Sequence, residues 1–251
     1  ARRAARAVAA PAAPGLGGVL RFDGGRSGAV IPDGILRGQD VCTLEFRVWM
    51  DSLTPLTTML GFALGDQQVQ IESLQVPSDL AFTAYYGGGA ADRVVVPGVL
   101  QSGQWIHVAA VCDGREITLY INGIRAAKGR LTNHIGRTIE GAGTFGSLEG
   151  AQSSIAGAMD EVRMWAVRRS PQQIAENMRG RLRGDEDGLL AMWNFDDGNN
   201  PGREVTGHPW DAVLTNTVHD AAPAELTSMD FSPLVVVNGS VADPDGRVVE
   251  G

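Results

Sequence analysis

Alternation of hydrophobic and polar residues is clearest over residues 103–129, GQWIHVAAVCDGREITLYINGIRAAKG. Three alternating runs are separated there by Asp-Gly at 113–114 and Asn-Gly at 122–123, which can supply the positive φ values of tight type I′ turns. The middle run places its aliphatic residues on one face: Ile117, Leu119 and Ile121. The pattern predicts a three-stranded antiparallel meander that buries one face in a core.

Short apolar or alternating runs recur elsewhere in the chain, and they predict strands over residues 18–22, 42–50, 58–64, 69–74, 81–86, 93–96 and 157–165. One amphipathic helix is predicted over residues 170–182, where Ser170 can cap the first turn and Pro171 occupies the first helical position. Its apolar residues recur on one face: Ile174, Met178 and Leu182. Many short strands with one helix predict an all-β sandwich.

The two ends of the chain differ from this region. Residues 1–16 are mostly Ala, Arg and Pro, and we interpret them as a linker or a processed flank. Residues 184–230 contain one strand-like run followed by a stretch, 201–229, predicted to be irregular; we interpret the segment as an extension that packs on the sandwich. Residues 231–251 alternate again, and they predict the start of a second, truncated β-sandwich module.

Composition and charge narrow the class of protein. The chain of 251 residues is 43% hydrophobic and 20% charged, as is typical of a globular protein, and it contains no apolar run of about 18 residues that would span a bilayer. The net charge of −8 argues against a nucleic-acid partner, because phosphate binding needs a basic surface. An acidic surface also suits cation binding.

Four segments in order carry a resemblance to a known family: LRFDG, CTLEFRVWMDSL, the meander, and GAMDEVRMWAVRRSPQQIAENMRGRL. Together they resemble the laminin G-like and pentraxin group of concanavalin-like jelly rolls over residues 17–183. The resemblance implies an all-β, two-sheet antiparallel jelly-roll sandwich with one short C-terminal helix. Residues 231–251 look like the opening of a carboxypeptidase-regulatory-like module.

Catalysis is not expected from the motifs. Glycoside hydrolases on this scaffold need two carboxylates about 5–10 Å apart, and the usual Glu-x-Asp-x-(x)-Glu strand does not occur. The acidic residues of 184–188 and 196–197 fall in predicted turns, where solvated charge is the ordinary interpretation. No i, i+4 histidine pair and no G-x-S-x-G motif occurs. We therefore predict that the protein is not an enzyme.

The resemblance to pentraxins implies a calcium site in the rim loops, with oxygen ligands as Ca²⁺ requires. The matching positions are Asp66, Gln67, Glu140, Glu149 and Gln152. One acidic position of the family falls on Ala142, which argues against a two-calcium site. The alternative is that these are ordinary polar residues of loops.

A second calcium ion is implied by relatives that tie the first and last strands together, here through Asp23 and Asp160. The alternative is that Asp23 serves its own Asp-Gly turn, while Asp160 forms a salt bridge with Arg163.

Pentraxins also bridge two strands at positions that correspond here to Glu45 and Ala109. Opposed residues of antiparallel strands keep a constant sum of positions, so Cys42 and Cys112 should face each other on the same ladder. A bond between them would close a loop of about 70 residues, contribute about 4 kcal/mol, and favour a secreted protein. Two reduced thiols in the core are the alternative.

Aromatic residues and a sequon complete the candidates. Tyr85 and Tyr86 precede three glycines at a predicted hairpin tip, which makes them candidate carbohydrate contacts, whereas the five tryptophans more often serve packing. Asn238 begins an N-glycosylation sequon.

The sequence thus predicts a non-catalytic extracellular or cell-surface recognition module that binds glycan or a protein partner through rim loops. The alternatives are a structural module that packs against flanking domains and, less favoured, a glycoside hydrolase.

Overall fold

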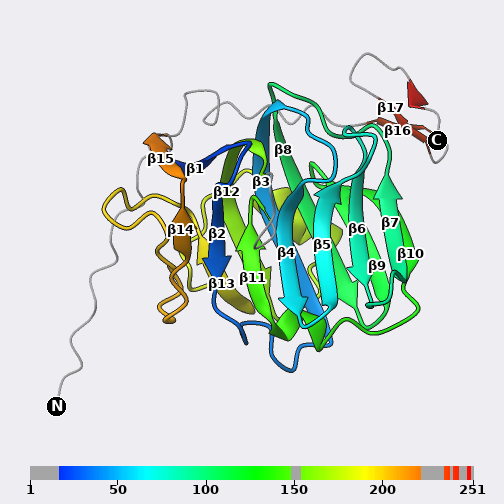
Figure 1. Cartoon of the computed structure of the whole chain (residues 1–251), viewed down its shortest axis with the longest axis horizontal. Coiled ribbons are helices and arrows are strands. Elements are labelled where there is room, and N and C mark those ends of the chain that lie inside the picture. Colours follow the sequence, from blue (N-terminus) through cyan, green and yellow to red (C-terminus); the bar gives the residue numbers. More distant parts are fainter. Residues whose placement is uncertain (1–16, 148–153, 222–234, 238–239, 243–247, 250–251) are drawn as a thin grey trace.

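The computed structural model describes residues 17–147, 154–221, 235–237, 240–242 and 248–249. Two antiparallel sheets lie face to face, and most strands run roughly parallel to one axis of the sandwich (Figure 1). The predicted all-β, two-sheet jelly-roll sandwich is confirmed.

The eight-stranded sheet has the order β10-β9-β8-β3-β12-β1-β15, with β13 also paired with β12. Its strands are β1 (Gly18–Asp23), β3 (Val41–Ser52), β8 (Trp105–Asp113), β9 (Glu116–Ile121), β10 (Ile124–Arg130), β12 (Ala156–Trp165), β13 (Leu189–Trp193) and β15 (Val218–Ala221).

The seven-stranded sheet has the order β14-β2-β11-β4-β5-β6-β7. Its strands are β2 (Gly28–Ile31), β4 (Thr58–Leu64), β5 (Gln67–Ser73), β6 (Leu80–Tyr85), β7 (Ala91–Val96), β11 (Ala142–Phe145) and β14 (Val213–Thr215). A 3₁₀ helix, η1 (Thr138–Glu140), precedes β11.

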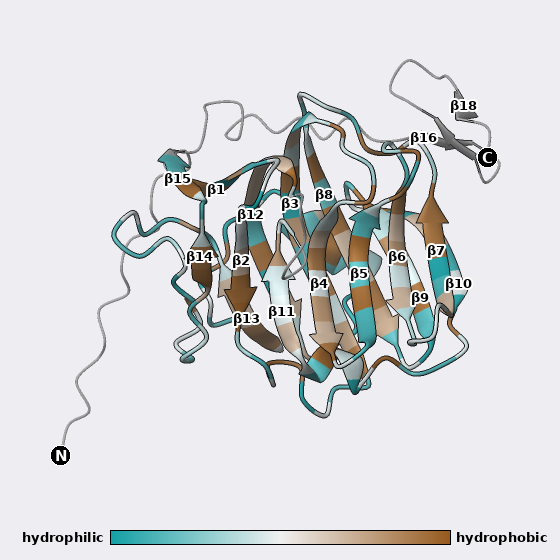
Figure 2. Ribbon diagram, viewed as in Figure 1, coloured by the Kyte–Doolittle hydropathy of each residue, from teal (hydrophilic) through white to brown (hydrophobic). Residues whose placement is uncertain are grey.

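The core fills the space between the two sheets. Side chains alternate between inward and outward directions along a strand, which gives the bands of brown and teal along β5 and β7 in Figure 2. The largest apolar side chains that are almost wholly buried include Phe46, Phe62, Phe82, Phe145 and Trp193. Phe145 meets Trp193 edge to face, with ring centroids 5.0 Å apart, and so links the seven-stranded sheet to β13.

The three-stranded meander is confirmed as β8, β9 and β10, but one of its turns differs from the prediction. Asn122 and Gly123 both have positive φ, at 48° and 79°, as a type I′ turn requires. In the first hairpin Asp113 pairs with Glu116, so Gly114 and Arg115 form the turn instead. Gly114 alone has positive φ, 62°, which is typical of type II′. The predicted type I′ turn at 113–114 is therefore wrong by one residue.

Helix α1 (Pro171–Asn177) lies on the outer face of the eight-stranded sheet and is shorter than predicted. Ser170 forms a capping box with Gln173, and Pro171 occupies the first turn as expected. The helix ends early because two buried arginines of the sheet bind its terminal carbonyls. Arg163 Nη1 donates to Asn177 O at 2.9 Å, and Arg47 Nε donates to Met178 O at 2.9 Å. Both guanidinium groups also donate to the carbonyl of Gly180.

Four short strands were not predicted. β2 and β11 have only four residues each, and both contain glycine, so neither shows a strand pattern by itself. β14 and β15 fall in 201–229, which we predicted to be irregular, and they pair with β2 and β1 respectively. Residues that follow 183 thus add strands to both sheets.

The end of the described chain forms a separate three-stranded sheet of β16 (Val235–Val237), β17 (Ser240–Ala242) and β18 (Val248–Val249). Asn238 lies outside the described residues, so the glycosylation prediction stays a prediction. In the described part of the chain, no helix has the length and apolar character needed to cross a bilayer.

Candidate functional site

The outer face of the seven-stranded sheet carries a continuous row of aligned residues. Val69, Ile71, Phe82 and Val94 point into the core, so the residues that alternate with them point outward. Successive strand pairings align the following positions across six strands: Val30, Thr144, Gly61, Gln70, Thr83 and Arg93. The half of this row on β5, β6 and β7 is polar.

Hydrogen bonds hold the polar side chains of this face in place. Thr58 Oγ1 donates to Gln70 Oε1 at 2.7 Å, and Gln70 Nε2 donates to Gln68 Oε1 at 2.7 Å. Because Thr58 and Gln70 are both buried, this chain of bonds fixes the orientation of the amide groups. A fixed set of amide donors and acceptors is suited to recognising hydroxyl groups.

A second cluster on the same face centres on Tyr85. The Tyr85 hydroxyl donates to Glu72 Oε1 at 2.8 Å, and the guanidinium carbon of Arg93 lies 5.8 Å from the centre of the Tyr85 ring. Burial, followed by the neighbouring Glu72, raises the pKa of Tyr85 above its usual value, so this phenol stays protonated. Tyr85 is half-buried and Arg93 exposed, so part of the ring and the cation are accessible.

Two hydroxyls of the row lack a hydrogen-bond partner among the described residues. They belong to Thr83, which has no exposed surface, and to Thr144, which is 5% exposed. Buried polar groups normally have partners, and leaving one unpaired costs about 1–3 kcal/mol. Because both hydroxyls are buried, a ligand reaches them only where a neighbouring side chain moves aside, such as the exposed Arg93 that pairs with Thr83.

The other half of the face is an apolar hollow of about 400 Å³. Its apolar lining includes Val30, Pro32, Ala63, Leu64 and Val213. Leu64 and Val213 are 42% and 69% exposed, and the exposed carboxylate of Asp33 stands at the rim. Ala63 pairs with Gln68, so the hollow adjoins the polar cluster directly. The face therefore offers apolar contact beside fixed polar groups.

Tyr86 has a structural role that the sequence did not show. Its hydroxyl donates to Asp92 Oδ2 at 2.7 Å, and its ring packs against the core. Burial and then this bond raise the pKa of Tyr86 to about 12. The hydrogen bond that Tyr86 donates is also the main reason that the pKa of Asp92 is lowered. Of the two tyrosines predicted at an exposed tip, Tyr85 lies on the candidate face and Tyr86 braces the hairpin.

The candidate calcium ligands of the rim do not converge in the described residues. The Asp66 carboxylate lies against Gly87, where a Cβ would collide with it. Gln67 Oε1 accepts a hydrogen bond from Thr138 Oγ1 at 3.1 Å, and Glu140 Oε1 accepts one from the Gly38 amide at 3.2 Å. No cluster of three His, Cys, Asp or Glu residues suited to a metal occurs in the described part of the chain.

Glu149 and Gln152 lie outside the described residues, so the rim-loop calcium site stays a prediction.

Asp23 and Asp160 are too far apart to share a calcium ion. Asp23 pairs with Ala156, four residues before Asp160 on β12, which corresponds to about 13 Å along a strand. Two ligands of one Ca²⁺ lie within about 5 Å of each other. Asp23 instead accepts hydrogen bonds from Ser27 and the Gly25 amide, which lower its pKa. The prediction that Asp23 and Asp160 share a calcium ion is therefore wrong. The alternative, that Asp23 stabilises its own Asp-Gly turn, is confirmed.

Asp160 belongs to a buried charge network that the sequence did not reveal. It lies 3.4 Å from Arg47, and not beside Arg163 as the alternative predicted. Arg163 instead binds Glu161 and lies 3.7 Å from Glu45. Burial, followed by Glu161, raises the pKa of Asp160 to about 7. These groups lie on the outer face of the eight-stranded sheet, beneath α1 and the residues after it, so they are structural.

Cys42 and Cys112 are direct partners on β3 and β8, which confirms the predicted register. In the structure both are free, buried thiols, and the Cys42 thiol and burial raise the pKa of Cys112 well above its usual value. Directly opposed residues have the Cα separation that a disulfide needs. The bond itself stays a prediction.

These two facing sheets, with α1 on one outer face and a polar row beside an apolar hollow on the other, define a lectin-like β-sandwich. The chain belongs to the Laminin_G_3 family, described as the concanavalin A-like lectin/glucanases superfamily, which matches residues 23–175. A search among curated proteins finds no match.

Solved structures share the fold at low sequence identity. A Bacteroides ovatus protein proposed to bind carbohydrate is 20% identical, with a TM-score of 0.63 over 82% of this chain and 60% of the other. The fourth domain of a Geobacillus stearothermophilus extracellular arabinanase, bound to arabinotriose, is 19% identical, with a TM-score of 0.56 over 63% and 75%. A heptameric pentraxin from Limulus polyphemus is 13% identical, with a TM-score of 0.58 over 84% and 97%. The chain thus spans three fifths of the Bacteroides protein.

Proposed function

We propose that this chain is a non-catalytic carbohydrate-recognition module of an extracellular or cell-surface protein, and that it binds glycan on the outer face of the seven-stranded sheet. The observation that carries the proposal is the pair of buried, unpartnered hydroxyls of Thr83 and Thr144, in one row with Gln70 and Arg93. Sugar hydroxyls both donate and accept hydrogen bonds, so they match this mixture of amide, hydroxyl and guanidinium groups.

The apolar hollow beside the row supports the same ligand class. A sugar ring presents C–H groups on its faces and hydroxyls at its edge, so a ring that lies on Ala63 can direct its hydroxyls to the adjacent Gln68 amide. A further ring of the same oligosaccharide can contact Val30 and Val213, three and four strands from Gln68. Pockets for small ligands combine apolar lining with a few fixed polar groups in this way. The arabinotriose bound to the Geobacillus domain supports a neutral oligosaccharide as the first ligand to test.

The charges of the face support binding without hydrolysis. Glycoside hydrolysis needs two carboxylates flanking one bond. Of the described carboxylates at this face, Glu72 is 3% exposed and held by Tyr85, and Asp211 accepts hydrogen bonds from Asn200 and the Glu204 amide, which leaves Asp33 at the rim of the hollow. A module of this kind would target or anchor the rest of a longer protein.

The decisive variant is Thr83→Val, which removes the hydroxyl and keeps the shape. Replacing an unpaired buried hydroxyl by a methyl group should leave the unliganded fold equally stable or slightly more stable. Binding of a neutral oligosaccharide such as arabinotriose, measured by calorimetry, should weaken by about fivefold or more, because a ligand hydrogen bond of about 1 kcal/mol is lost. Thr206→Val is the matched control, because the Thr206 hydroxyl donates to the Leu190 carbonyl and lines neither hollow.

Equal affinities of wild type and Thr83→Val for every glycan bound would disprove this site. The alternative, a protein-interaction module, would be favoured if a screen finds no glycan that binds and a protein partner is found that binds at the edge strands β14 and β15. The exposed Val213 and Val218 on β14 and β15, 69% and 62% exposed, are the observation that favours that alternative.

A further inference from the structure

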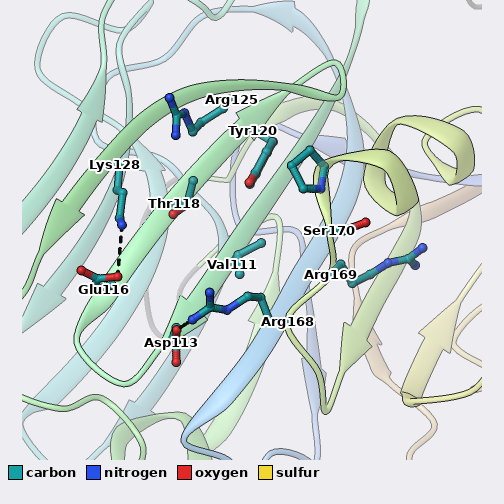
Figure 3. A pocket seen from close by; sticks show the side chains of 11 residues that line it. Val111, Asp113, Glu116, Thr118, Tyr120, Arg125, Lys128, Arg168, Arg169 and Ser170 are labelled. Carbon is teal, nitrogen blue, oxygen red and sulfur yellow. Dashed lines mark ion pairs between the residues drawn. The ribbon is translucent and has the colours of Figure 1, made fainter.

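A second hollow, of about 320 Å³, lies on the opposite side of the sandwich. It is bounded by the start of α1 on one side and by the exposed edge strand β10 on the other, above β8 and β9 (Figure 3). Helix α1 covers part of the outer face of the eight-stranded sheet, with Ile174 packed on Val111 and Tyr120. The strands beyond the helix stay uncovered, which creates the hollow.

Tyr120 forms the floor of the hollow. Its side chain is almost wholly buried, with 7% of the residue exposed, yet no hydrogen bond of its hydroxyl is found in the described part of the chain. Figure 3 shows this hydroxyl directed toward the space between the surrounding side chains, on the side of Thr118. The Tyr120 hydroxyl is not among the buried polar atoms without a partner, so it reaches the surface of the hollow, where a ligand can bind it.

Three exposed cations, Arg125, Lys128 and Arg168, line the hollow, although the protein carries a net charge of −8. A fourth, Arg169, is buried against the Trp165 ring. Lys128 lies 3.1 Å from Glu116, and Arg168 pairs with Asp113. Arg125 has no ion pair with any residue that the structure describes. The side chains of Lys128 and Arg168 are 51% and 60% exposed, and such exposed pairs contribute only about 0–1 kcal/mol. Both cations can therefore turn to a bound anion at little cost.

The two carboxylates restrict the kind of anion. Asp113 and Glu116 would repel a ligand whose charges are closely spaced, such as an acidic peptide or a nucleic acid. They would accept hydrogen bonds from hydroxyl groups, however. The ring of Tyr120, with Pro171 and Val111, adds apolar surface beneath these groups. A ligand with one anionic group, several hydroxyls and an apolar ring face matches all of these features.

From this arrangement we infer a second binding site, between α1 and β10, for a saccharide unit that bears a carboxylate or a sulfate group. The site is on the opposite sheet from the proposed neutral-glycan face and shares none of its residues, so either can fail without the other. In this site Arg125 and Lys128 bind the anionic group, while Tyr120 and Thr118 bind hydroxyl groups of the saccharide. A face of the sugar ring lies against the Tyr120 ring.

The test uses the full chain and three defined probes, with binding measured by calorimetry. Trigalacturonate carries carboxylates, its methyl ester is the same saccharide without charge, and a carrageenan tetrasaccharide carries sulfate instead. We expect one of the two acidic probes to bind at least about tenfold more tightly than the ester, with affinity falling as salt rises from about 0.05 to about 0.5 M. Which acidic probe binds better identifies the anionic group.

Variants then assign the site to named residues. Arg125→Gln and Lys128→Gln should each weaken binding of the acidic probe about three- to tenfold, the range for losing one charged contact at a half-exposed site. Tyr120→Phe removes only the hydroxyl and keeps the ring against Ile174, so it should weaken binding severalfold with an unchanged thermal midpoint. Arg183→Gln, which removes a charge that is 78% exposed and lines no part of the hollow, should change nothing.

The inference is overturned if neither acidic saccharide binds at up to about 10 mM, or if the methyl ester binds equally well. It is also overturned if tetraglutamate competes as effectively as the saccharide, because the surface would then attract anions of any kind. Retained affinity in all three hollow variants would place the binding elsewhere. Thr83→Val should leave binding of the acidic probe unchanged, which separates this site from the proposed neutral-glycan face.

Discussion

Replacing Arg163 by methionine keeps its apolar stem and removes a guanidinium that has almost no exposed surface. The group makes two hydrogen bonds to Glu161 Oε2 and one each to the carbonyls of Asn177 and Gly180. It also lies 3.7 Å from Glu45, which is fully buried. The substitution leaves two buried carboxylates with less positive charge, and it removes one of two donors from each of the carbonyls of Asn177 and Gly180.

Removing one member of a buried ion pair costs about 3–5 kcal/mol, because the remaining charge stays desolvated. We expect Arg163→Met to lower the free energy of unfolding by at least this amount. For a chain of this size each kcal/mol corresponds to about 2–4 °C in thermal midpoint, so the midpoint should fall by roughly 6–20 °C. Urea unfolding followed by fluorescence, with calorimetry for the midpoint, measures both quantities.

Arg21→Met is the matched control, since Arg21 pairs with Asp51 at the surface, where the two side chains are 34% and 48% exposed. Its cost should stay near 0–1 kcal/mol. Adding Glu161→Gln to Arg163→Met should recover part of the loss, because one uncompensated charge is removed; a double-mutant cycle gives the coupling. A loss of less than about 1 kcal/mol in Arg163→Met would refute the view that this network holds α1 and the following residues on the sheet.

Three further predictions concern other parts of the fold. Burial raises the pKa of Asp160 to about 7 from the usual 3.8, so its contribution to stability is present in full below about pH 4 and is lost as pH rises toward 7. Urea midpoints of Asp160→Asn should lack the decline seen in wild type between about pH 4 and pH 7, and parallel profiles would contradict this. Protein exported to an oxidising compartment should show no free thiol at Cys42 or Cys112 when denatured without reductant, and reduction should cost about 4 kcal/mol; two titratable thiols would disprove the bridge. Gly123→Ala should destabilise the protein more than Gly65→Ala. Both glycines have positive φ, but a Cβ at Gly123 would lie 2.9 Å from Met178 Sδ, whereas a Cβ at Gly65 would have nothing within 4 Å. Equal unfolding free energies of the two variants would show that the α1 region does not pack tightly on the turn at Gly123.

Local signals explain why most of the sandwich could be predicted from the sequence. The meander has two-residue turns and strict alternation, so its strands were found within a few residues. β2 and β11 escaped prediction because their four residues become strands only through pairing with each other and with β4. The type of the first turn depended on where Asp113 pairs, which no dipeptide determines. The helix end depended on Arg47 and Arg163, which are remote in sequence.

The candidate face could be predicted only in part, because it is assembled from several strands. Tyr85 was singled out from its place before three glycines, and it lies on the face. Gln70, Thr83 and Arg93 carry no motif, and they form a row only because β5, β6 and β7 pair in one register. The calcium positions came from a resemblance in spacing, and spacing does not determine direction: Asp66 and Glu140 contact different segments.

A comparison of the two outer faces explains why the seven-stranded sheet is the better place to bind a ligand. Under α1, outward-facing charges meet opposite charges. Glu45 lies 3.6–3.7 Å from His107, Arg163 and Arg169, and although burial alone would raise its pKa, its interaction with His107 and the charges of the two arginines lower it. Both carboxylate oxygens of Glu45 also lack a hydrogen bond among the described residues, but they have charged neighbours. On the seven-stranded sheet, the buried hydroxyls of Thr83 and Thr144 have neither a hydrogen bond nor an ion pair among the described residues, so the proposed ligand site depends on these two groups.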